Sequence, residues 1–232
     1  MSLSNSQIQK SASRFDKAGV AQPFPGNTVL IRVVAGSRLH KKLQSLVAVL
    51  TSALPEDKIA WLPAASWHIT LAGGVCEFLR DETRWPPGQS ARPLKECTSS
   101  FAELLACEGV ELERRGLGPP YAMRTQGLQL FGKTIWVTFT GSTDEEELRL
   151  RSLKNRIADT LGFRHPNHAE YAWHVSLAYL LEESCAGEEE DILSTLRPAI
   201  AASEEIYDFG PAEFCTFKDM ASYETVCTIG SD

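Results

Sequence analysis

The sequence predicts an α+β fold built from two copies of one unit, and three observations support this. Apolar runs of strand length alternate with amphipathic segments of helical period along most of the 232 residues. The second half of the chain repeats the order of elements found in the first. The segment W-H-I-T-L-A at 67–72 returns as W-H-V-S-L-A at 173–178, with four identities and two conservative exchanges. Two such units, related by a pseudo-two-fold axis, would bring their equivalent strands together.

Length and composition indicate one domain with a sizeable core, since 43% of the residues are apolar. Residues 1–27, rich in Ser and Gln, are expected to be a loosely packed lead-in, and residues 28–232 to form a single bilobal domain. No apolar run approaches the roughly 18 residues that cross a bilayer. Residues 1–10 lack the apolar stretch of a secretory signal. We therefore expect a cytoplasmic protein with no membrane partner.

Charge and cysteine content narrow the function further. The net charge is −7, whereas proteins that grip long nucleic acid usually present a strongly basic face. A long nucleic acid is therefore not expected as partner, although a local basic pocket remains compatible with this composition. No two of the six cysteines form a C-x-x-C pair, and we expect buried thiols rather than disulfides or metal ligands.

Hydrophobic periodicity and breaker residues give the expected elements. In the first half we expect a strand at 28–34, a helix at 39–54, a strand at 66–71, an exposed loop at 80–96 and a short helix at 98–107. In the second half we expect strands at 121–130 and 134–140, a helix at 143–161, a strand at 172–180, a helix at 188–206, and strands at 212–217 and 223–229.

The internal repeat has a constant offset. His174 lies 174 − 68 = 106 residues after His68, and the same offset carries Thr28, in the opening strand of the first half, onto Thr134 in the second. Each half therefore begins its first strand equally far before its histidine. Duplication of one unit explains this spacing better than coincidence.

Each repeat places an imidazole and a hydroxyl on one face of a strand, because residues i and i+2 point to the same side. His68 and Thr70 share a face in the first copy, and His174 and Ser176 share a face in the second. The intervening tryptophan and aliphatic residues form the opposite, apolar face. The next residue on each of these faces is a small alanine, Ala72 or Ala178, which leaves space for a ligand. Two matched triplets of this kind indicate a shared ligand site.

This arrangement suits displacement at phosphorus. One imidazole takes a proton from the incoming nucleophile and the other donates a proton to the leaving oxygen; a pKa near 6.5 makes both forms accessible near neutrality. The hydroxyls of Thr70 and Ser176 can donate hydrogen bonds to the non-bridging oxygens. This chemistry requires no metal, and we expect no cofactor. The pseudo-symmetry leaves open which histidine is the acid and which the base.

The motifs His68-Ile69-Thr70-Leu71 and His174-Val175-Ser176-Leu177 resemble the paired H-x-[ST]-Φ signature of the two-histidine phosphoesterase superfamily, where Φ is apolar. This superfamily contains LigT-like RNA ligases and cyclic phosphodiesterases. The resemblance covers roughly residues 28–230. It implies a bilobal α+β fold, with two antiparallel sheets flanking a central cleft and helices outside. It also implies hydrolysis of a 2′,3′-cyclic phosphate or a related phosphodiester at a nucleotide or RNA end.

Four further residues are candidates for substrate contact, by stacking on a base or holding a phosphate. They are Trp85, Tyr121, Arg124 and Tyr179, and ordinary packing explains each of them equally well. His165 and His168 lie in a Pro-Asn segment without a nearby cysteine, so we expect a solvent-facing loop rather than a metal site.

Three alternative functions stay open. The same site can run in reverse, as RNA end joining of the 2′–5′ type. A non-catalytic module can recognise a nucleotide or RNA end through the same cleft, although binding alone does not need two proton carriers. A metal-dependent hydrolase is the weakest alternative, because the histidines show no H-E-x-x-H spacing. The oligomeric state is not determined by the sequence, and a monomer is compatible with it.

Overall fold

The computed structural model describes residues 14–181, 194 and 205–230, and its strands form one antiparallel sheet. The strands are β1 (Gly26–Arg32), β2 (Ile59–Trp61), β3 (His68–Cys76), β4 (Tyr121–Phe131), β5 (Thr134–Gly141), β6 (Trp173–Leu180), β7 (Ile206–Phe209), β8 (Ala212–Phe217) and β9 (Tyr223–Ile229). Their order is β7-β4-β5-β6-β3-β1-β8-β9, and β2 pairs with β6. The helices are α2 (Arg38–Ala53), α3 (Leu94–Ala106), α4 (Glu108–Arg114) and α5 (Asp144–Leu161).

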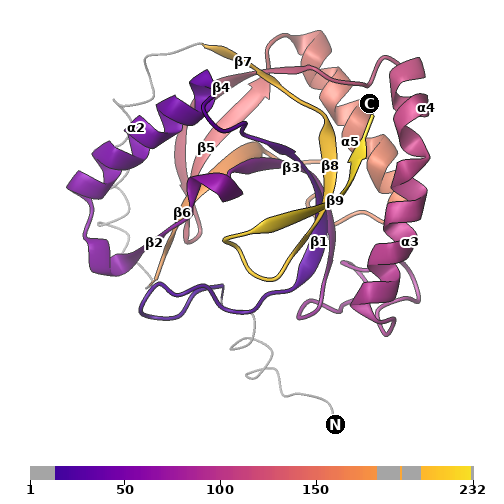
Figure 1. Cartoon of the computed structure of the whole chain (residues 1–232), viewed down its shortest axis with the longest axis horizontal. Coiled ribbons are helices and arrows are strands. Elements are labelled where there is room, and N and C mark those ends of the chain that lie inside the picture. The colour runs from indigo at the N-terminus through magenta and orange to yellow at the C-terminus, as the bar shows by residue number, and fades with distance from the viewer. Residues whose placement is uncertain (1–13, 182–193, 195–204, 231–232) are drawn as a thin grey trace.

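The sheet curls around a central space and the helices lie outside it, with α2 on one side and α3, α4 and α5 on the other (Figure 1). The predicted α+β class is confirmed. The two halves meet at β3 and β6, where Ile69 pairs with Val175. The two expected sheets are therefore one continuous sheet. Pairing the edges of β3 and β6 satisfies backbone groups that two separate sheets would leave without partners.

The strand register repeats with the offset seen in the sequence. Each β1–β3 pair from Thr28 to Arg32 recurs between β5 and β6 with 106 added to both residue numbers. Arg32 pairs with His68 in the first ladder, and Thr138 pairs with His174 in the second. Both ladders also shift register at the same equivalent point, after Val29 and after Ile135. The two histidines thus occupy equivalent positions in two equivalent ladders.

Helices α2 and α5, which follow β1 and β5, also begin in the same way. Ser37 caps α2 by accepting a hydrogen bond from the backbone N–H of His40, and Thr143 caps α5 by accepting one from Glu146. The two caps are again 143 − 37 = 106 residues apart. Helix α5 ends at Gly162, whose φ of 78° is the left-handed conformation that glycine adopts without strain.

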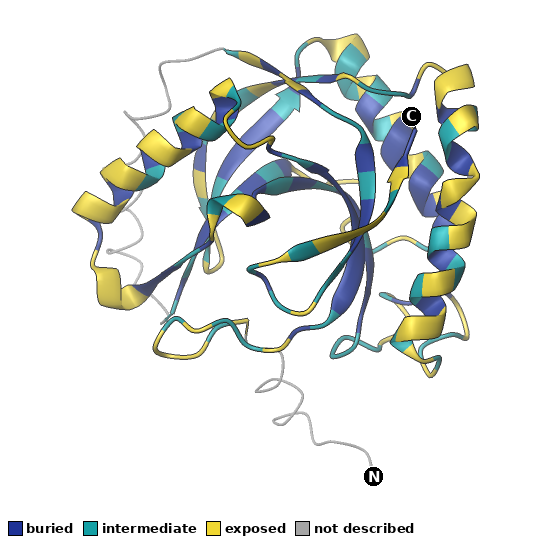
Figure 2. Ribbon diagram, in the orientation of Figure 1, coloured by how far each residue is buried: buried dark blue, intermediate teal, exposed yellow. Residues whose placement is uncertain are grey.

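Burial follows the expected alternation along β3 and β6 (Figure 2). Ile69, Leu71, Val175 and Leu177 have no exposed surface, while the histidines and hydroxyls between them are partly exposed. The apolar side chains belong to the hydrophobic core. The core therefore fixes the face of each strand that carries the candidate chemistry, because a slip of one residue would bury the histidines.

Several expected boundaries were wrong. Helix α3 begins at Leu94, inside the segment expected to be loop, and α4, β2 and β7 were not foreseen. The helix expected at 188–206 falls almost wholly outside the described residues, and its last residue, Ile206, belongs to β7. Strands β2 and β7 have only three and four residues, which are too few to show a periodic sequence pattern.

The lead-in and the thiols also differ from expectation. Strand β1 starts at Gly26, and Phe24 before it is buried, so the end of the lead-in packs on the domain. Cys76, Cys97 and Cys215 are buried free thiols, but Cys107 is exposed. No helix in the described part of the chain is both long and apolar enough to cross a bilayer.

Gly74 in β3 provides a test of this packing. A Cβ there would lie 2.0 Å from Oδ1 of Asn27, which accepts a hydrogen bond from the backbone N–H of Val75. We expect Gly74→Ala to lower the free energy of unfolding by about 2–4 kcal/mol, measured by urea denaturation, because the clash displaces that buried amide.

Gly127→Ala in β4 is the matched control, since a Cβ there meets nothing within 4 Å. It should change stability by less than about 0.5 kcal/mol. Equal effects of the two substitutions would contradict the packing described for β3.

Candidate active site

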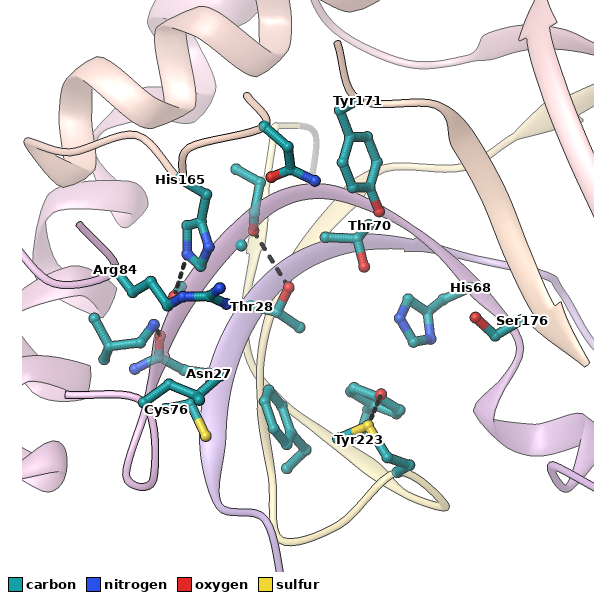
Figure 3. Close-up of a pocket in the computed structure, with 18 of the residues that line it drawn as sticks. Asn27, Thr28, His68, Thr70, Cys76, Arg84, His165, Tyr171, Ser176 and Tyr223 are labelled. Carbon is teal, nitrogen blue, oxygen red and sulfur yellow. Dashed lines mark hydrogen bonds between the residues drawn. The ribbon is translucent and has the colours of Figure 1, made fainter. Parts of the chain in front are cut away.

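The sheet and its neighbouring loops enclose a cavity of about 310 Å³ that contains both motifs (Figure 3). His68 and Thr70 reach it from β3, and His174 and Ser176 reach it from β6. The structure thus brings together all four residues that the sequence marked as catalytic candidates. A volume of this size is sufficient for a small ligand.

Each histidine is held by the backbone carbonyl two residues before it. Nδ1 of His68 lies 2.7 Å from the carbonyl oxygen of Ser66, and Nδ1 of His174 lies 2.8 Å from that of Ala172. A carbonyl only accepts hydrogen bonds, so Nδ1 carries the hydrogen in both rings. In each neutral ring, Nε2 then carries the lone pair and is available to exchange a proton.

The pairing of β3 with β6 sets the spacing of the four groups. Because Ile69 lies opposite Val175 in an antiparallel pair, His68 falls across from Ser176, and Thr70 falls across from His174. Figure 3 shows Ser176 beside His68. The two histidines are then diagonal neighbours with Cα atoms roughly 7–8 Å apart, within reach of aromatic side chains. Both histidines line the same cavity, so a ligand bound there can contact both rings.

Each motif hydroxyl lies close enough to a tyrosine to affect its pKa. Burial raises the pKa of both phenols, against the lowering effect of Thr70 on Tyr171 and of Ser176 on Tyr179. Both phenols therefore stay protonated and can donate. A tyrosine that donates to the motif oxygen leaves the hydrogen of that hydroxyl free for a ligand. The sequence interpretation missed Tyr171, which lies in a loop with no periodic signal.

The two imidazoles sit in different surroundings. Burial, together with the charges of His174 and Arg32, lowers the pKa of His68 to about 4, against the raising effect of the Ser66 carbonyl. The edge of Tyr223 contacts this ring at 4.3 Å between centroids. Burial also lowers the pKa of His174, but its ring stacks on Trp136 at 3.7 Å, and an aromatic face stabilises a cation.

The cavity is locally basic although the chain is acidic. Its cationic lining residues are Arg14, Arg84, Lys154 and Arg164. No carboxylate lines it among the residues that the structure describes. The basic pocket that composition left open is therefore present, and it favours an anionic ligand.

Lys154 is the most unusual of these cations. Its side chain, on α5, is 4% exposed, and Nζ donates to the carbonyl of Leu71 at 3.4 Å. Nζ also lies 4.5 Å from the ring centroid of Tyr171. Burial lowers its pKa to about 8, helped by the charge of Arg151. A lysine among the buried apolar positions of an amphipathic helix was the sequence signal that could have identified it.

Of the four residues expected to contact substrate, Tyr179 lines the cavity and the other three do not. Trp85 is fully buried and its Nε1–H donates to the carbonyl of Leu79 at 3.0 Å. Tyr121 is also buried, and its hydroxyl donates to the carbonyl of Leu117. Arg124 is exposed on β4, outside the cavity lining. Burial excludes the two aromatic residues as substrate contacts, so those assignments were wrong, whereas Arg124 only lies outside this cavity.

The loop of His165 and His168 faces solvent at Pro166 and Asn167, as expected, but its two histidines are half-buried. Both residues line the cavity. Nε2 of His165 lies 2.8 Å from the carbonyl oxygen of Gly74, and Nε2 of His168 lies 2.8 Å from Oδ1 of Asn155. The loop packs against the end of β3, which the sequence could not indicate because these contacts are long-range.

Comparison with known proteins agrees with this geometry. Residues 14–116 match the family model 2H-phosphodiest, described as "Domain of unknown function (DUF1868)". The crystal structure of a conserved protein of unknown function, ATU0111 from Agrobacterium tumefaciens str. C58, is 27% identical with a TM-score of 0.75, covering 95% of this chain and 92% of that one. The first motif, His68 to Leu71, lies inside the residues that this family model matches.

The crystal structure of E. coli LigT complexed with 3′-AMP is 13% identical with a TM-score of 0.52, covering 89% of this chain and 97% of that one. At this identity the likeness shows a shared fold. No curated protein matches the sequence. The family model ends before His174, so the assignment of the second motif depends on the repeated register and on the cavity that both motifs line.

The burial of Lys154 has a measurable effect on stability. Its pKa of about 8 in the folded protein lies below its ordinary value of 10.5, so the unfolded chain binds this proton more tightly. Its contribution to stability therefore rises with pH between about 8 and 10.5. We expect Lys154→Met to raise the free energy of unfolding at pH 7 by roughly 1–3 kcal/mol and to remove that rise.

Urea denaturation at pH 7 and pH 10 measures the stability at pH 7 and its rise with pH. Lys41→Met, at an exposed position of α2, is the control that should change neither. Destabilisation by Lys154→Met at pH 7 would show that the lysine is well solvated or paired.

Proposed function

We propose that this chain is a two-histidine phosphoesterase that opens a nucleoside 2′,3′-cyclic phosphate, or a related phosphodiester at an RNA end, without a metal. The observation that carries the proposal is the pair of histidines, each fixed through Nδ1 to a carbonyl and sharing one basic cavity. The 3′-AMP in the LigT structure is a ligand of that protein that carries a ribose phosphate. A cavity of about 310 Å³ suits a nucleotide better than a long RNA.

The reaction is an in-line displacement by water. The water oxygen bonds to phosphorus while one histidine takes its proton on Nε2, and the bond from phosphorus to one ribose oxygen breaks on the opposite side. The other histidine, protonated on Nε2, gives its proton to that leaving oxygen, so the product is a phosphomonoester. Thr70 and Ser176 donate hydrogen bonds to the non-bridging oxygens, where negative charge increases in the transition state.

The surroundings of the rings favour His68 as base and His174 as acid. His68 resists protonation because it is buried near the positive charges of His174 and Arg32. His174 lies against the face of Trp136, which favours the imidazolium form. In this assignment, the base His68 lies across from Ser176, and the acid His174 lies across from Thr70.

Turnover of a 2′,3′-cyclic nucleotide tests the proposal. We expect hydrolysis that persists in EDTA, and a loss of about 10²–10⁴-fold in kcat for His68→Ala and for His174→Ala, because each removes one proton transfer. His40→Ala is the control, a histidine on α2 outside the cavity lining.

Three other outcomes of this assay identify the alternatives. Binding without turnover across a panel of phosphodiesters would favour a recognition module. Activity that is lost in EDTA and restored by zinc would favour a metal-dependent hydrolase. Net joining of RNA ends at the same site would favour 2′–5′ ligation.

The pH dependence of kcat/KM tests the acid and base assignment. Below its pKa of about 4, His68 is protonated and cannot act as base; above its pKa, which lies under 6.5, His174 loses the proton that it must donate. We expect a bell-shaped profile with its maximum on the acid side of neutrality. Trp136→Leu should move the alkaline limb to lower pH. An acid limb at the ordinary histidine value of 6.5 would contradict the environment assigned to His68.

A further inference from the structure

The two halves of the cavity differ at the ends of their histidine strands. Tyr179 and Leu180 in β6 are equivalent to Gly73 and Gly74 in β3, since 73 + 106 = 179 and 74 + 106 = 180. Tyr179 places a ring in the cavity, 5.1 Å from that of Phe15. The glycines place no side chain there, although both line the cavity. The cavity therefore reaches the backbone at the end of β3, where the other half carries a tyrosine.

Polar side chains border this end of the cavity. His165 is the equivalent of Ile59 in β2 (59 + 106 = 165), so one half has an apolar strand where the other has a polar loop. A Cβ on Gly73 would lie 3.0 Å from Nε2 of His165, which shows how closely this loop approaches the strand. Figure 3 shows His165 and Arg84 on the side of the cavity opposite to His68 and Ser176.

The charge at this end is incompletely compensated. Arg84 has a carboxylate partner, Asp81, at 3.3 Å. Lys154 forms no ion pair among the described residues, and its one hydrogen bond, to a carbonyl, is long. A buried cation of this kind costs stability unless an anion approaches it. Its position on the cavity wall indicates that the anion comes with the ligand.

We propose that Lys154 and Arg84 form a second anion subsite, which binds a further phosphate of the substrate beyond the one between the histidines. The inference rests on the proposed function. Gly73 lies three residues along β3 from Thr70, a separation of roughly 10 Å between backbone positions. A ribose with a phosphate at each end covers a span of this order. The preferred substrate is therefore a 2′,3′-cyclic nucleotide that also carries a 5′-phosphate.

Steady-state kinetics compare adenosine 2′,3′-cyclic phosphate with its 5′-phosphorylated form. We expect kcat/KM of the wild-type protein to be at least about 10-fold higher for the 5′-phosphorylated substrate, the factor that one charge-assisted contact of about 1.4 kcal/mol supplies. Lys154→Met and Arg84→Gln should each reduce this ratio towards 1, mainly through KM. Lys41→Met, which removes an exposed charge outside the cavity lining, should leave the ratio unchanged.

A binding measurement separates this inference from the proposed reaction. By calorimetry, adenosine 3′,5′-bisphosphate should bind about 10-fold more tightly than 3′-AMP, and both cavity variants should abolish the difference. If neither cyclic nucleotide is hydrolysed but this difference is found, the reaction is wrong and the subsite stands. If the cyclic nucleotides are hydrolysed but the wild-type protein does not discriminate, or the variants discriminate equally well, the subsite is overturned.

Discussion

Each motif histidine donates one hydrogen bond from Nδ1 to the carbonyl two residues earlier, and the proposed chemistry depends on this pair of bonds. They fix the tautomer and the ring orientation without a carboxylate. A carboxylate partner would raise the histidine pKa and add negative charge to a cavity that must accept a phosphate. A neutral carbonyl orients the ring without either effect, so the anion meets a basic lining and two available Nε2 atoms.

The junction of β3 and β6 converts two separate motifs into one site. A single strand carries only one imidazole and one hydroxyl on its open face, which is insufficient for in-line displacement. Pairing Ile69 with Val175 brings the two strands together in antiparallel orientation, so each histidine lies beside the hydroxyl of the other strand. The buried aliphatic residues on the opposite face hold this register, because a slip would place both histidines in the core.

The repeat in the sequence predicted what the two halves share, and not what distinguishes them. The histidines, the hydroxyls and the α+β order follow from local pattern, which is strong where apolar periodicity is long. Trp85 and Tyr121 were misassigned because an aromatic residue has the same sequence signature in a core and in a site. The subsite residues Arg84 and Lys154 come from elements that only the tertiary fold brings together. The difference between the two histidine strands is visible in the sequence only when Gly73 is aligned with Tyr179. Its consequence for ligand binding can be inferred only from the residues that line the cavity.

The most direct test of the central claim is the ¹⁵N NMR spectrum of the imidazole nitrogens at pH 7, assigned with His68→Gln and His174→Gln. The account predicts that both rings are neutral with the hydrogen on Nδ1, and that saturating 3′-AMP shifts the Nε2 resonances of both. A hydrogen on Nε2 in either free ring, or an Nε2 that does not respond to the ligand, would contradict the account, because that ring would then not face the phosphate as an acid or base.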